Sequence, residues 1–378
     1  MMPDNVTMSH AAARVEALIG QLLGGRMGSY IAGEIVPGTG AALTLTNPAD
    51  GQTLLSFPDA GAPVVEQAMQ AARGAQRAWM AQSAAARGRA MNEIARLVRA
   101  NAEALAELEM LSAGKPIRDT RGEVAKVAEM FEYYAGWADK LHGEVIPVPS
   151  SHLNYTRPEP LGTVVQITPW NAPIFTAGWQ IAPAICAGNA VVLKPSELTP
   201  LTTLALGALC DQAEGLPRGL VSILAGAGPT TGAAAVAHPD TRLVVFVGSA
   251  EAGAQIAAAA ARNIVPSVLE LGGKSANIVF ADADIERALI GAQAAIFGGA
   301  GQSCVAGSRL LVDRRIHAQF VERLAAAAAK IPFGLPSDPA TQIGPINNRR
   351  QFEKIGAMVE AAQQSGALPV SYTHLRAH

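Results

Sequence analysis

From Leu161 onward the sequence alternates short apolar runs with longer helical stretches, and this alternation constrains the fold more than any other feature. The apolar runs are continuous, which is typical of parallel strands buried on both faces of a sheet. Five such runs lie at 163–167, 190–193, 221–224, 243–247 and 268–271. Helices are predicted between them at 199–214 (capped by Thr199), 230–237 and 251–261. The pattern predicts an α/β fold with a doubly wound parallel sheet of the dinucleotide-binding type.

A second α/β unit is predicted after this sheet. Its apolar runs and helical patterns lie at 276–280, 284–297, 309–312 and 317–330. Each run is followed by a helical stretch, which again favours strands joined by helices. The polar, proline-rich stretch 141–160, which precedes the first sheet, is expected to form a hairpin or arm.

The first part of the chain is predicted to be helical. An extended segment at 41–57 leads into three amphipathic patterns. The first begins at Pro63, and the second is capped by Ser83 and stops near Gly114. The third has helical spacing of Val124, Val127, Phe131, Tyr134 and Trp137. Residues 1–27 lack the pattern of a signal peptide and are expected to form a loose extension.

Charge and cysteine content exclude several classes of protein. The chain has 29 Lys and Arg against 31 Asp and Glu, so it is not expected to bind nucleic acid or an anionic membrane. Only three cysteines occur, which favours a reducing, cytoplasmic location without disulfides. The stretch 161–193 has no charged residue, but its prolines and side-chain amides argue against a membrane span.

A glycine-rich turn follows the predicted strand 221–224. The spacing Gly226-x-Gly228-x-x-x-Gly232 places glycines between a strand and a helix, as in loops that bind phosphate. It is one residue out of step with the common dinucleotide fingerprint. A plain tight turn therefore remains an equal alternative.

Cys304 differs from the other two cysteines in its surroundings. Cys186 and Cys210 lie in apolar helical patterns and are predicted to be buried small side chains. Cys304 follows Gly301-Gln302-Ser303, where polar and small neighbours leave a thiol accessible for nucleophilic attack. No histidine stands at a spacing that suggests a Cys-His pair, and no metal site is expected.

Two polar residues follow predicted strands and are candidates for catalysis. Glu270 stands beside apolar residues, where burial would raise the pKa of a carboxyl group and make it a base. The alternative for Glu270 is an ion pair with Lys274. Asn171 can donate its side-chain amide to an oxyanion, or it can merely cap the helix that begins near Pro173.

Taken together and in this order, the motifs resemble the aldehyde dehydrogenase superfamily. The matching segments are Ile167-Thr-Pro-Trp-Asn-Ala-Pro173, Val191-Val-Leu-Lys-Pro-Ser-Glu197, Phe246-Val-Gly-Ser249, Leu269-Glu-Leu-Gly-Gly-Lys274 and Gly301-Gln-Ser-Cys304. The resemblance covers roughly residues 30–368. It implies an NAD-binding domain with a doubly wound sheet, an α/β catalytic domain, and a homodimer or homotetramer.

The resemblance also implies a role for each candidate residue. Cys304 attacks an aldehyde, Asn171 and the Cys304 backbone N–H hold the oxyanion, and Glu270 activates the water that releases a carboxylic acid. NAD is the implied hydride acceptor, in preference to NADP because the carboxylate of Glu197 repels a 2′-phosphate. The implied cofactor-binding residues are Ile167, Thr168, Pro169, Trp170, Lys194, Ser196, Glu197, Gly228, Gly232, Phe246, Gly248, Ser249, Leu271 and Gly272.

Some positions depart from the family pattern. Val247, Gly299 and Gln180 replace a common Thr, Asn and Lys, and Gly299 is expected to loosen the loop that carries Cys304. The expected division is an extension at 1–27, an NAD-binding domain at 28–268 with its arm at 141–160, and a partial catalytic domain at 269–368. The tail 369–378 does not continue the family pattern, so we expect a chain truncated at its C-terminal side that is unstable or inactive.

Two alternatives to a hydrolytic dehydrogenase stay open at this point. An acylating enzyme would pass the thioester to coenzyme A, but such relatives typically lack the glutamate found here at position 270. A non-catalytic member would keep the fold without turnover. The presence of Cys304, Glu270 and Asn171 together favours catalysis.

Overall fold

The computed structural model describes residues 6–367 of the chain. A seven-stranded sheet with the order β11-β10-β7-β8-β9-β1-β2 forms its centre. Its strands are β1 (Ser29–Ile31), β2 (Glu34–Val36), β7 (Thr163–Ile167), β8 (Ala190–Lys194), β9 (Val221–Ile223), β10 (Thr241–Gly248) and β11 (Ser267–Leu271). The five strands from β7 to β11 are parallel, which confirms the predicted doubly wound sheet. The segment 369–378 lies outside the described residues.

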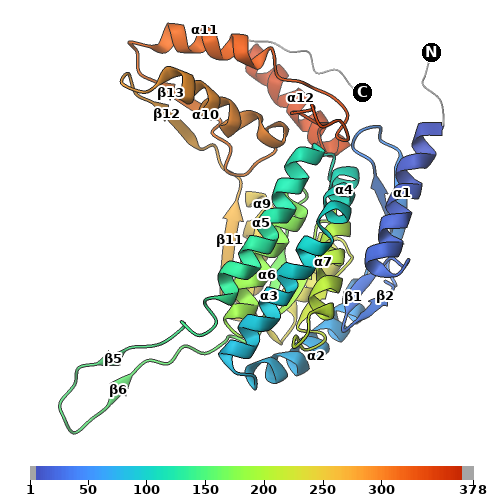
Figure 1. Ribbon diagram of the computed structural model, residues 1–378, viewed down its shortest axis with the longest axis vertical. Helices are drawn as coiled ribbons and strands as arrows, with labels where there is room; N and C mark the ends of the chain where they lie inside the picture. The colour runs from blue at the N-terminus through green and yellow to red at the C-terminus, as the bar shows by residue number, and fades with distance from the viewer. Residues whose placement is uncertain (1–5, 368–378) are drawn as a thin grey trace.

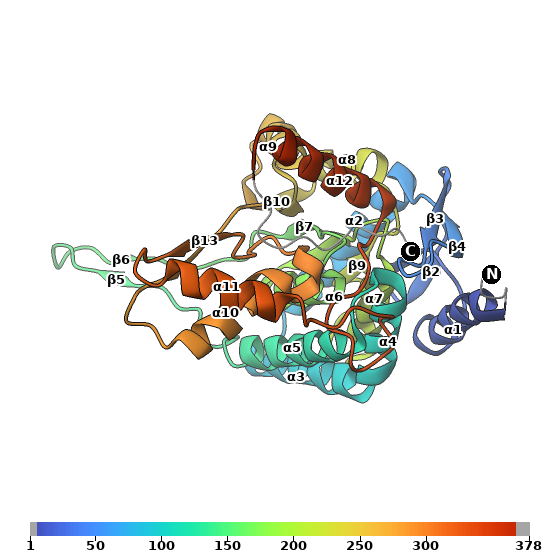
Figure 2. The same ribbon diagram turned by 90° about the horizontal axis from the view of Figure 1, so that it is seen from above.

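Helices cover both faces of this sheet, as Figure 2 shows from above. On one face lie α2 (Gly61–Met80), the turn η1 (Gly228–Gly232), α8 (Ala233–Ala237) and α9 (Ala250–Arg262). On the other face lie α6 (Pro173–Cys186) and α7 (Leu201–Gln212), and a further layer packs on these two: α3 (Ala84–Ala100), α4 (Ala102–Ala113) and α5 (Ile117–Ala135). The layers bury β7 and β8 completely.

The N-terminal segment is not the loose extension that the sequence suggested. Helix α1 (Val6–Leu23) packs against α7 and α4, and its side chains Val15 and Leu18 are fully buried. The spacing of Val15, Leu18, Ile19 and Leu22 is that of one helical face, and this is the pattern that sequence reasoning missed. Strands β1 and β2 then extend the sheet in antiparallel fashion, with Tyr30 opposite Ile223.

The helices of the first part confirm most of the predicted boundaries. The hydroxyl of Ser83 accepts a hydrogen bond from the Ala86 N–H and caps α3. The second predicted helix is divided at Asn101 into α3 and α4, and α4 ends at Gly114 in the left-handed region, with φ of 75°. The extended segment forms a separate hairpin, β3 (Ala42–Thr46) and β4 (Thr53–Pro58). The predicted cap at Thr199 is wrong, because Pro200 precedes α7 and makes no side-chain cap.

The stretch 141–160 projects from the body of the molecule as a long arm (Figure 1). Its tip region pairs β5 (Val145–Ile146) with β6 (Asn154–Tyr155). Apolar side chains stand exposed along it, with Val145 and Leu153 each 75% exposed. The structure thus confirms the predicted hairpin.

Residues 272–367, called here the β12–β13 region, stand apart from the large sheet (Figure 1). Two parallel strands form their own sheet, β12 (Ala276–Val279) and β13 (Arg309–Val312). The helices are α10 (Ile285–Phe297), the short η2 (Gly298–Gly301), α11 (His317–Ala328) and α12 (Arg349–Gln364). The buried core of this region consists of Val279, Leu289, Ala292 and Phe320. The predicted strands and helices of the second unit are confirmed, and α12 is an addition.

Polar contacts join the β12–β13 region to the loop between α4 and α5. The side chain of Asn347 donates to the carbonyl oxygen of Ala113 at 3.0 Å, and the N–H of Ile117 donates to the carbonyl oxygen of Pro336 at 2.8 Å. Gly344 packs so tightly here that a side-chain carbon would lie 2.5 Å from the Gly114 carbonyl oxygen. The α4–α5 loop is therefore a junction between the two parts of the molecule.

Candidate active site

The sheet order places a topological switch point between β7 and β10. The chain runs from β7 through β8 to β9 on one side, then returns to β10 and β11 on the other. Ligands of open α/β sheets bind outside the carboxyl ends of the strands at such a point. Ile167 ends β7 and Gly248 ends β10 at this point. The structure therefore brings together the candidate site residues at the ends of these two strands.

Three features beside the switch point fit a polar ligand. The hydroxyl of Thr168, directly after β7, is buried and has no hydrogen-bond partner among the described residues. Lys194, 3% exposed, donates to the carboxylate of Glu197 at 3.0 Å. A side-chain carbon at Gly232 would lie 3.5 Å from the Lys194 side chain and 3.9 Å from that of Ile167. The glycine therefore leaves the space between these residues open.

The turn from β10 into α9 has the geometry of an anion site. The Ser249 hydroxyl accepts from the Ala252 N–H at 3.2 Å, so the helix begins at the switch point with its N–H groups directed there. A side-chain carbon at Gly253 would lie 2.6 Å from Leu271, which lets α9 pack directly on β11. Sequence reasoning missed Gly253; the spacing Gly248-x-x-x-x-Gly253 after a strand was the available indication.

The loop Gly226–Gly232 is filled by a carboxylate. Asp59 accepts hydrogen bonds from the Ala227 N–H at 2.9 Å, from Thr231 at 2.6 Å and from Thr230. Burial acts to raise the pKa of Asp59, but these hydrogen bonds outweigh it and hold the pKa below its usual range. A phosphate here would meet a negative charge, so the structure favours the tight-turn interpretation of this loop.

Cys304 is the exposed cysteine of the chain, whereas Cys186 and Cys210 are buried. Burial raises the pKa of both buried thiols, which keeps them protonated. The residues before Cys304 form a left-handed turn, with φ of 60° at Gly299, 57° at Ala300 and 71° at Gly301. A non-glycine residue in this conformation costs on the order of 1 kcal/mol, so contacts must hold the turn.

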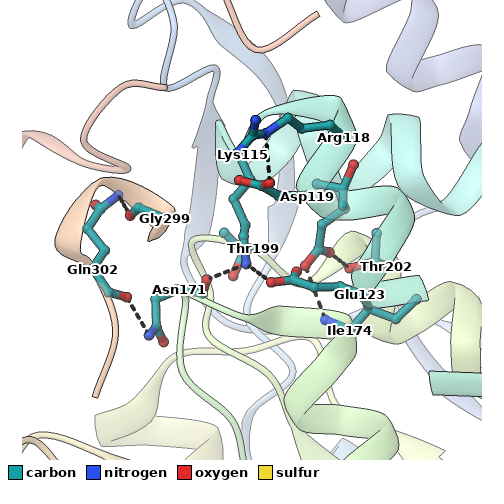
Figure 3. A network of polar contacts seen from close by, with 12 residues as sticks. Lys115, Arg118, Asp119, Glu123, Asn171, Ile174, Thr199, Thr202, Gly299 and Gln302 are labelled. Atoms are coloured by element: carbon teal, nitrogen blue, oxygen red, sulfur yellow. Dashed lines mark hydrogen bonds and ion pairs between the residues drawn. The ribbon is translucent and has the colours of Figure 1, made fainter. Parts of the chain in front are cut away.

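The side chain of Gln302 supplies those contacts. Its amide nitrogen donates to the Gly299 carbonyl oxygen at 3.1 Å, and its amide oxygen accepts from the Asn347 N–H at 2.9 Å (Figure 3 shows the first). The loop that carries Cys304 is thus tied both to itself and to the junction at Ala113. Gly299 accepts one of these hydrogen bonds through its backbone carbonyl oxygen, and the expectation that it loosens the loop stays a prediction.

Asn171 lies beside the Cys304 loop. Its side-chain nitrogen donates to the carbonyl oxygen of Gln302 at 2.7 Å. The helix cap proposed as its alternative role is wrong, because Ala172 occupies the N-cap position of α6. The side-chain amide of Asn171 is therefore directed at the segment that carries the exposed thiol, although the two segments lie far apart in the sequence.

Glu270 lies on β11 and is exposed, so the burial expected from its apolar neighbours is absent. It lines a cavity of about 330 Å³ together with Trp179, Gln180 and Val247. Lys274 donates to the carbonyl oxygen of Gly273 at 3.1 Å rather than pairing with Glu270. A side-chain carbon at Gly273 would lie 3.7 Å from the Cys304 carbonyl oxygen. The loop after Glu270 therefore lies against the Cys304 segment.

The described part of the chain holds neither a metal-binding cluster nor a membrane-spanning helix. Within residues 6–367, His, Cys, Asp and Glu side chains form no group of three or more that could hold a metal ion. In the same range, no helix is long and apolar enough to cross a membrane. The uncharged stretch 161–193 divides into β7, α6 and most of β8.

Comparison with known proteins gives one consistent family. The model of the aldehyde dehydrogenase family matches residues 35–375. Human retinal dehydrogenase 2 is 42% identical over 334 residues, which cover 87% of this chain and 64% of that protein. The putative aldehyde dehydrogenase DhaS of Bacillus subtilis is 39% identical over 368 residues, covering 96% of this chain and 74% of DhaS.

Solved structures give the same result. PnpE from Pseudomonas sp. WBC-3 superposes with a TM-score of 0.89 at 41% identity, covering 92% of this chain and 71% of PnpE. Betaine aldehyde dehydrogenase from Staphylococcus aureus, solved in complex with NAD+, has a TM-score of 0.89 at 35% identity and covers 95% and 71% of the two chains. The chain spans 64% of the length of the retinal dehydrogenase it matches.

Proposed function

The chain belongs to the aldehyde dehydrogenase family, and on that premise we propose that it oxidises an aldehyde to a carboxylic acid with NAD as the hydride acceptor. The observation that carries the proposal is the 2.7 Å hydrogen bond from the Asn171 amide to the Gln302 carbonyl oxygen. Through this hydrogen bond an amide donor at the carboxyl edge of the sheet lies next to the segment that carries the exposed thiol of Cys304.

In this reaction the thiolate of Cys304 forms a bond to the aldehyde carbon, and the carbonyl electron pair moves onto oxygen. The Asn171 amide and the Cys304 N–H donate to that oxygen and stabilise the thiohemiacetal. When bound, NAD supplies the acceptor for the hydride that the carbon gives up. Glu270 then takes a proton from a water molecule, whose oxygen attacks the resulting thioester and releases the acid. Its exposed position beside a cavity supports access to water.

The residues at the switch point fit the cofactor. Glu197 would accept from the hydroxyl groups of the adenosine ribose, with Lys194 holding its carboxylate. The N-terminus of α9 at Ser249 would hold the pyrophosphate, and the unpartnered Thr168 hydroxyl provides a further polar contact. The negative charge of Glu197 supports NAD over NADP.

An assay of NADH production over a panel of aldehydes tests the proposal. Aldehyde-dependent reduction of NAD is the activity measured; Cys304→Ala should abolish that turnover, and Asn171→Ala should lower kcat about a hundredfold because one oxyanion donor is gone. Cys186→Ala, which alters a buried thiol, is the matched control and should keep its activity. Binding of NAD without NADH production would contradict the proposal and favour a non-catalytic member of the family.

The acylating alternative is separated by the same assay with coenzyme A. Glu270 is present, and the proposed hydrolytic reaction uses it as the base. NADH production is therefore expected without coenzyme A and should fall sharply in Glu270→Gln. A strict requirement for coenzyme A would contradict the hydrolytic proposal.

We also propose a homodimer or homotetramer and a cytoplasmic location. The projecting arm, with exposed Val145, Leu153 and Tyr155, supports assembly because an unpaired apolar hairpin gains from pairing with another subunit. Sedimentation of the chain, compared with that of a variant carrying polar substitutions in the arm, would test the proposed assembly.

The cysteines support the proposed cytoplasmic location. All three are free, which fits a reducing compartment.

A further inference from the structure

The segment that carries Asn171 is held by a hydrogen bond from a buried ammonium group. Lys115, in the loop between α4 and α5, donates to the backbone carbonyl oxygen of Asn171 at 3.1 Å (Figure 3). Its side chain is 11% exposed and forms an ion pair with Glu123 on α5. A hydrogen bond from a charged donor is about twice as strong as one between neutral groups. The carbonyl of Asn171 is therefore firmly fixed.

Two other buried side chains fix the backbone on either side of Asn171. The Thr199 hydroxyl donates to the Trp170 carbonyl oxygen at 3.3 Å. Glu109, on α4, accepts from the Ile174 N–H at 3.3 Å. With these contacts in place, Lys115 contributes the contact to Asn171 itself, since its acceptor is the carbonyl oxygen of that same residue.

Fixing this carbonyl matters because it sets where the Asn171 amide is directed. The amide reaches the Gln302 carbonyl oxygen at 2.7 Å, two residues before Cys304. The carbonyl carbon of Asn171 is bonded to the Cα that carries the side chain, so a displacement of this backbone segment carries the Cα–Cβ bond with it and moves the amide away from the Cys304 loop. A displacement of about 1 Å in a catalytic group can cost up to a hundredfold in rate.

We propose that Lys115 is a positioning residue for Asn171: by holding the Asn171 carbonyl, its ammonium group directs the side-chain amide toward the Cys304 loop. The inference deepens the proposed function, since it rests on Asn171 being the oxyanion donor. Lys115 touches neither substrate nor the reacting atoms, and its effect passes entirely through Asn171. That dependence distinguishes it from a residue that merely stabilises the fold.

The test compares the parent chain with the double variant Lys115→Met/Glu123→Gln. Removing both charges together leaves neither buried group without its partner, since an unpaired buried charge strongly destabilises a protein and can unfold it. Removing the ammonium in this setting is expected to lower kcat about tenfold. The dissociation constant for NAD should stay within about twofold, because Lys194, Glu197 and Ser249 lie on other elements. Lys115→Arg keeps the charge and the donors and should restore most of the rate.

A double-mutant cycle with Asn171→Ala decides whether the effect passes through Asn171. When Asn171 is already alanine, removing Lys115 is expected to cause no further loss, so the two effects are not additive. Equal losses with and without the Asn171 amide would overturn the proposal. An unchanged kcat in the Lys115 variant would overturn it as well.

A second measurement does not depend on turnover. Cys304 is the exposed thiol, so its alkylation rate by iodoacetamide reports on the Cys304 loop. Loss of Lys115 is expected to raise this rate about threefold or more, because the loop loses its contact with the Asn171 amide and opens more often. No change should occur when Asn171 is alanine. If the parent chain shows no aldehyde oxidation, the proposed function is contradicted. The alkylation rates with and without the Asn171 amide still decide whether Lys115 acts through Asn171.

Lys126→Met is the matched control. Lys126 lies on α5 and, like Lys115, pairs with a carboxylate, here that of Glu129, but it is 61% exposed and lies outside the site. Its replacement should leave kcat and the alkylation rate unchanged. An equal effect of both lysine substitutions would show a general effect of charge and would overturn the assignment of Lys115.

Discussion

The sheet and the β12–β13 region are stabilised in different ways. The sheet and its helices share one continuous apolar core that reaches from Val15 to Ala260, and strands β7 and β8 are buried along their whole length. The β12–β13 region has a core of four buried residues and several exposed large side chains, among them Phe280 and Ile290. The thiol lies in the weakly packed part, and most of its candidate partners lie in the strongly packed part.

This difference indicates how the site is assembled. The cofactor side follows from the sheet itself, because its residues lie at strand ends that the core fixes. The thiol side is placed by a few hydrogen bonds to the α4–α5 junction and to Asn171. Substitutions in the core of the β12–β13 region should therefore disturb the part of the site that carries Cys304 and leave the cofactor side intact. Substitutions at the α4–α5 junction should change the geometry of the site more than the stability of the fold.

Phe320→Ala is expected to have the largest effect. Phe320 is fully buried and is the largest member of the small core, so its truncation should cost about 3–5 kcal/mol. Hydrogen exchange is expected to rise throughout residues 272–367, while the sheet keeps its protection and binds NAD. Phe333→Ala, in the same region but 63% exposed, is the control and should change little. Equal loss of protection in both parts would contradict the comparison.

A pH effect is expected in the sheet part. Burial, reinforced by the nearby charge of Glu123, raises the pKa of Glu109 to about 7. Between about pH 4.5 and pH 7 the unfolded state releases this proton while the folded state keeps it, so stability falls as the pH rises through that window. The shift corresponds to about 3 kcal/mol.

Glu109→Gln, followed by urea unfolding at several pH values, measures this effect. The variant should lack about half of the decline, while a comparable part should remain from Asp211, whose pKa burial raises to about 6. The β12–β13 region should respond in the opposite sense, because hydrogen bonds from Arg315 lower the pKa of Asp313 to about 2, so that its contribution is lost only in strong acid. A Glu109→Gln profile that matches the parent would contradict this assignment.

The junction predicts a smaller effect. Asn347→Ala removes the 3.0 Å hydrogen bond to the Ala113 carbonyl oxygen and should cost about 1–2 kcal/mol. Hydrogen exchange should increase around Gln302 and residues 343–347, with kcat reduced and NAD binding kept. Asn263→Ala removes a comparable exposed hydrogen bond within the sheet part and serves as the control. Unchanged exchange around Gln302 would show that the junction does not hold the thiol loop.

The smallest effect concerns cofactor choice. Glu197→Gln removes the negative charge that would face a 2′-phosphate, while keeping the amide oxygen as an acceptor for Lys194. The ratio of kcat/KM for NADP to that for NAD should rise about tenfold or less, since Glu197 is partly exposed and its charge is screened. A ratio that stays constant would place the ribose away from Glu197.

Much of the sheet was predictable because its indications are local. The run from Thr163 to Ile167 is apolar apart from Thr163 and Gln166, and the structure gives β7 those bounds. Ser83 and Gly114 were predictable as helix ends because capping depends on a few neighbouring residues. The pairing of Tyr30 with Ile223 was not, since it joins segments far apart in the chain.

The site shows the same limit. Asn171 and Glu270 stand out by residue type and position at strand ends, and Cys304 by its small and polar neighbours. The burial of Glu270, however, depends on what covers the sheet at β11. That strand is an edge strand with an exposed face, so its apolar neighbours do not bury the carboxylate. The contact of Lys115 with Asn171 joins residues 56 positions apart, and no local pattern indicates it.

Trapping the covalent intermediate tests the central claim most directly. Glu270→Gln should be mixed with NAD and an aldehyde that the parent oxidises, and the intact protein should be weighed by mass spectrometry. We expect a mass increase equal to the acyl group less the thiol hydrogen it replaces, located on Cys304 and absent from Glu270→Gln/Cys304→Ala. Aldehyde oxidation without an adduct, or an adduct on another residue, would contradict the assignment of Cys304 as nucleophile and Glu270 as base.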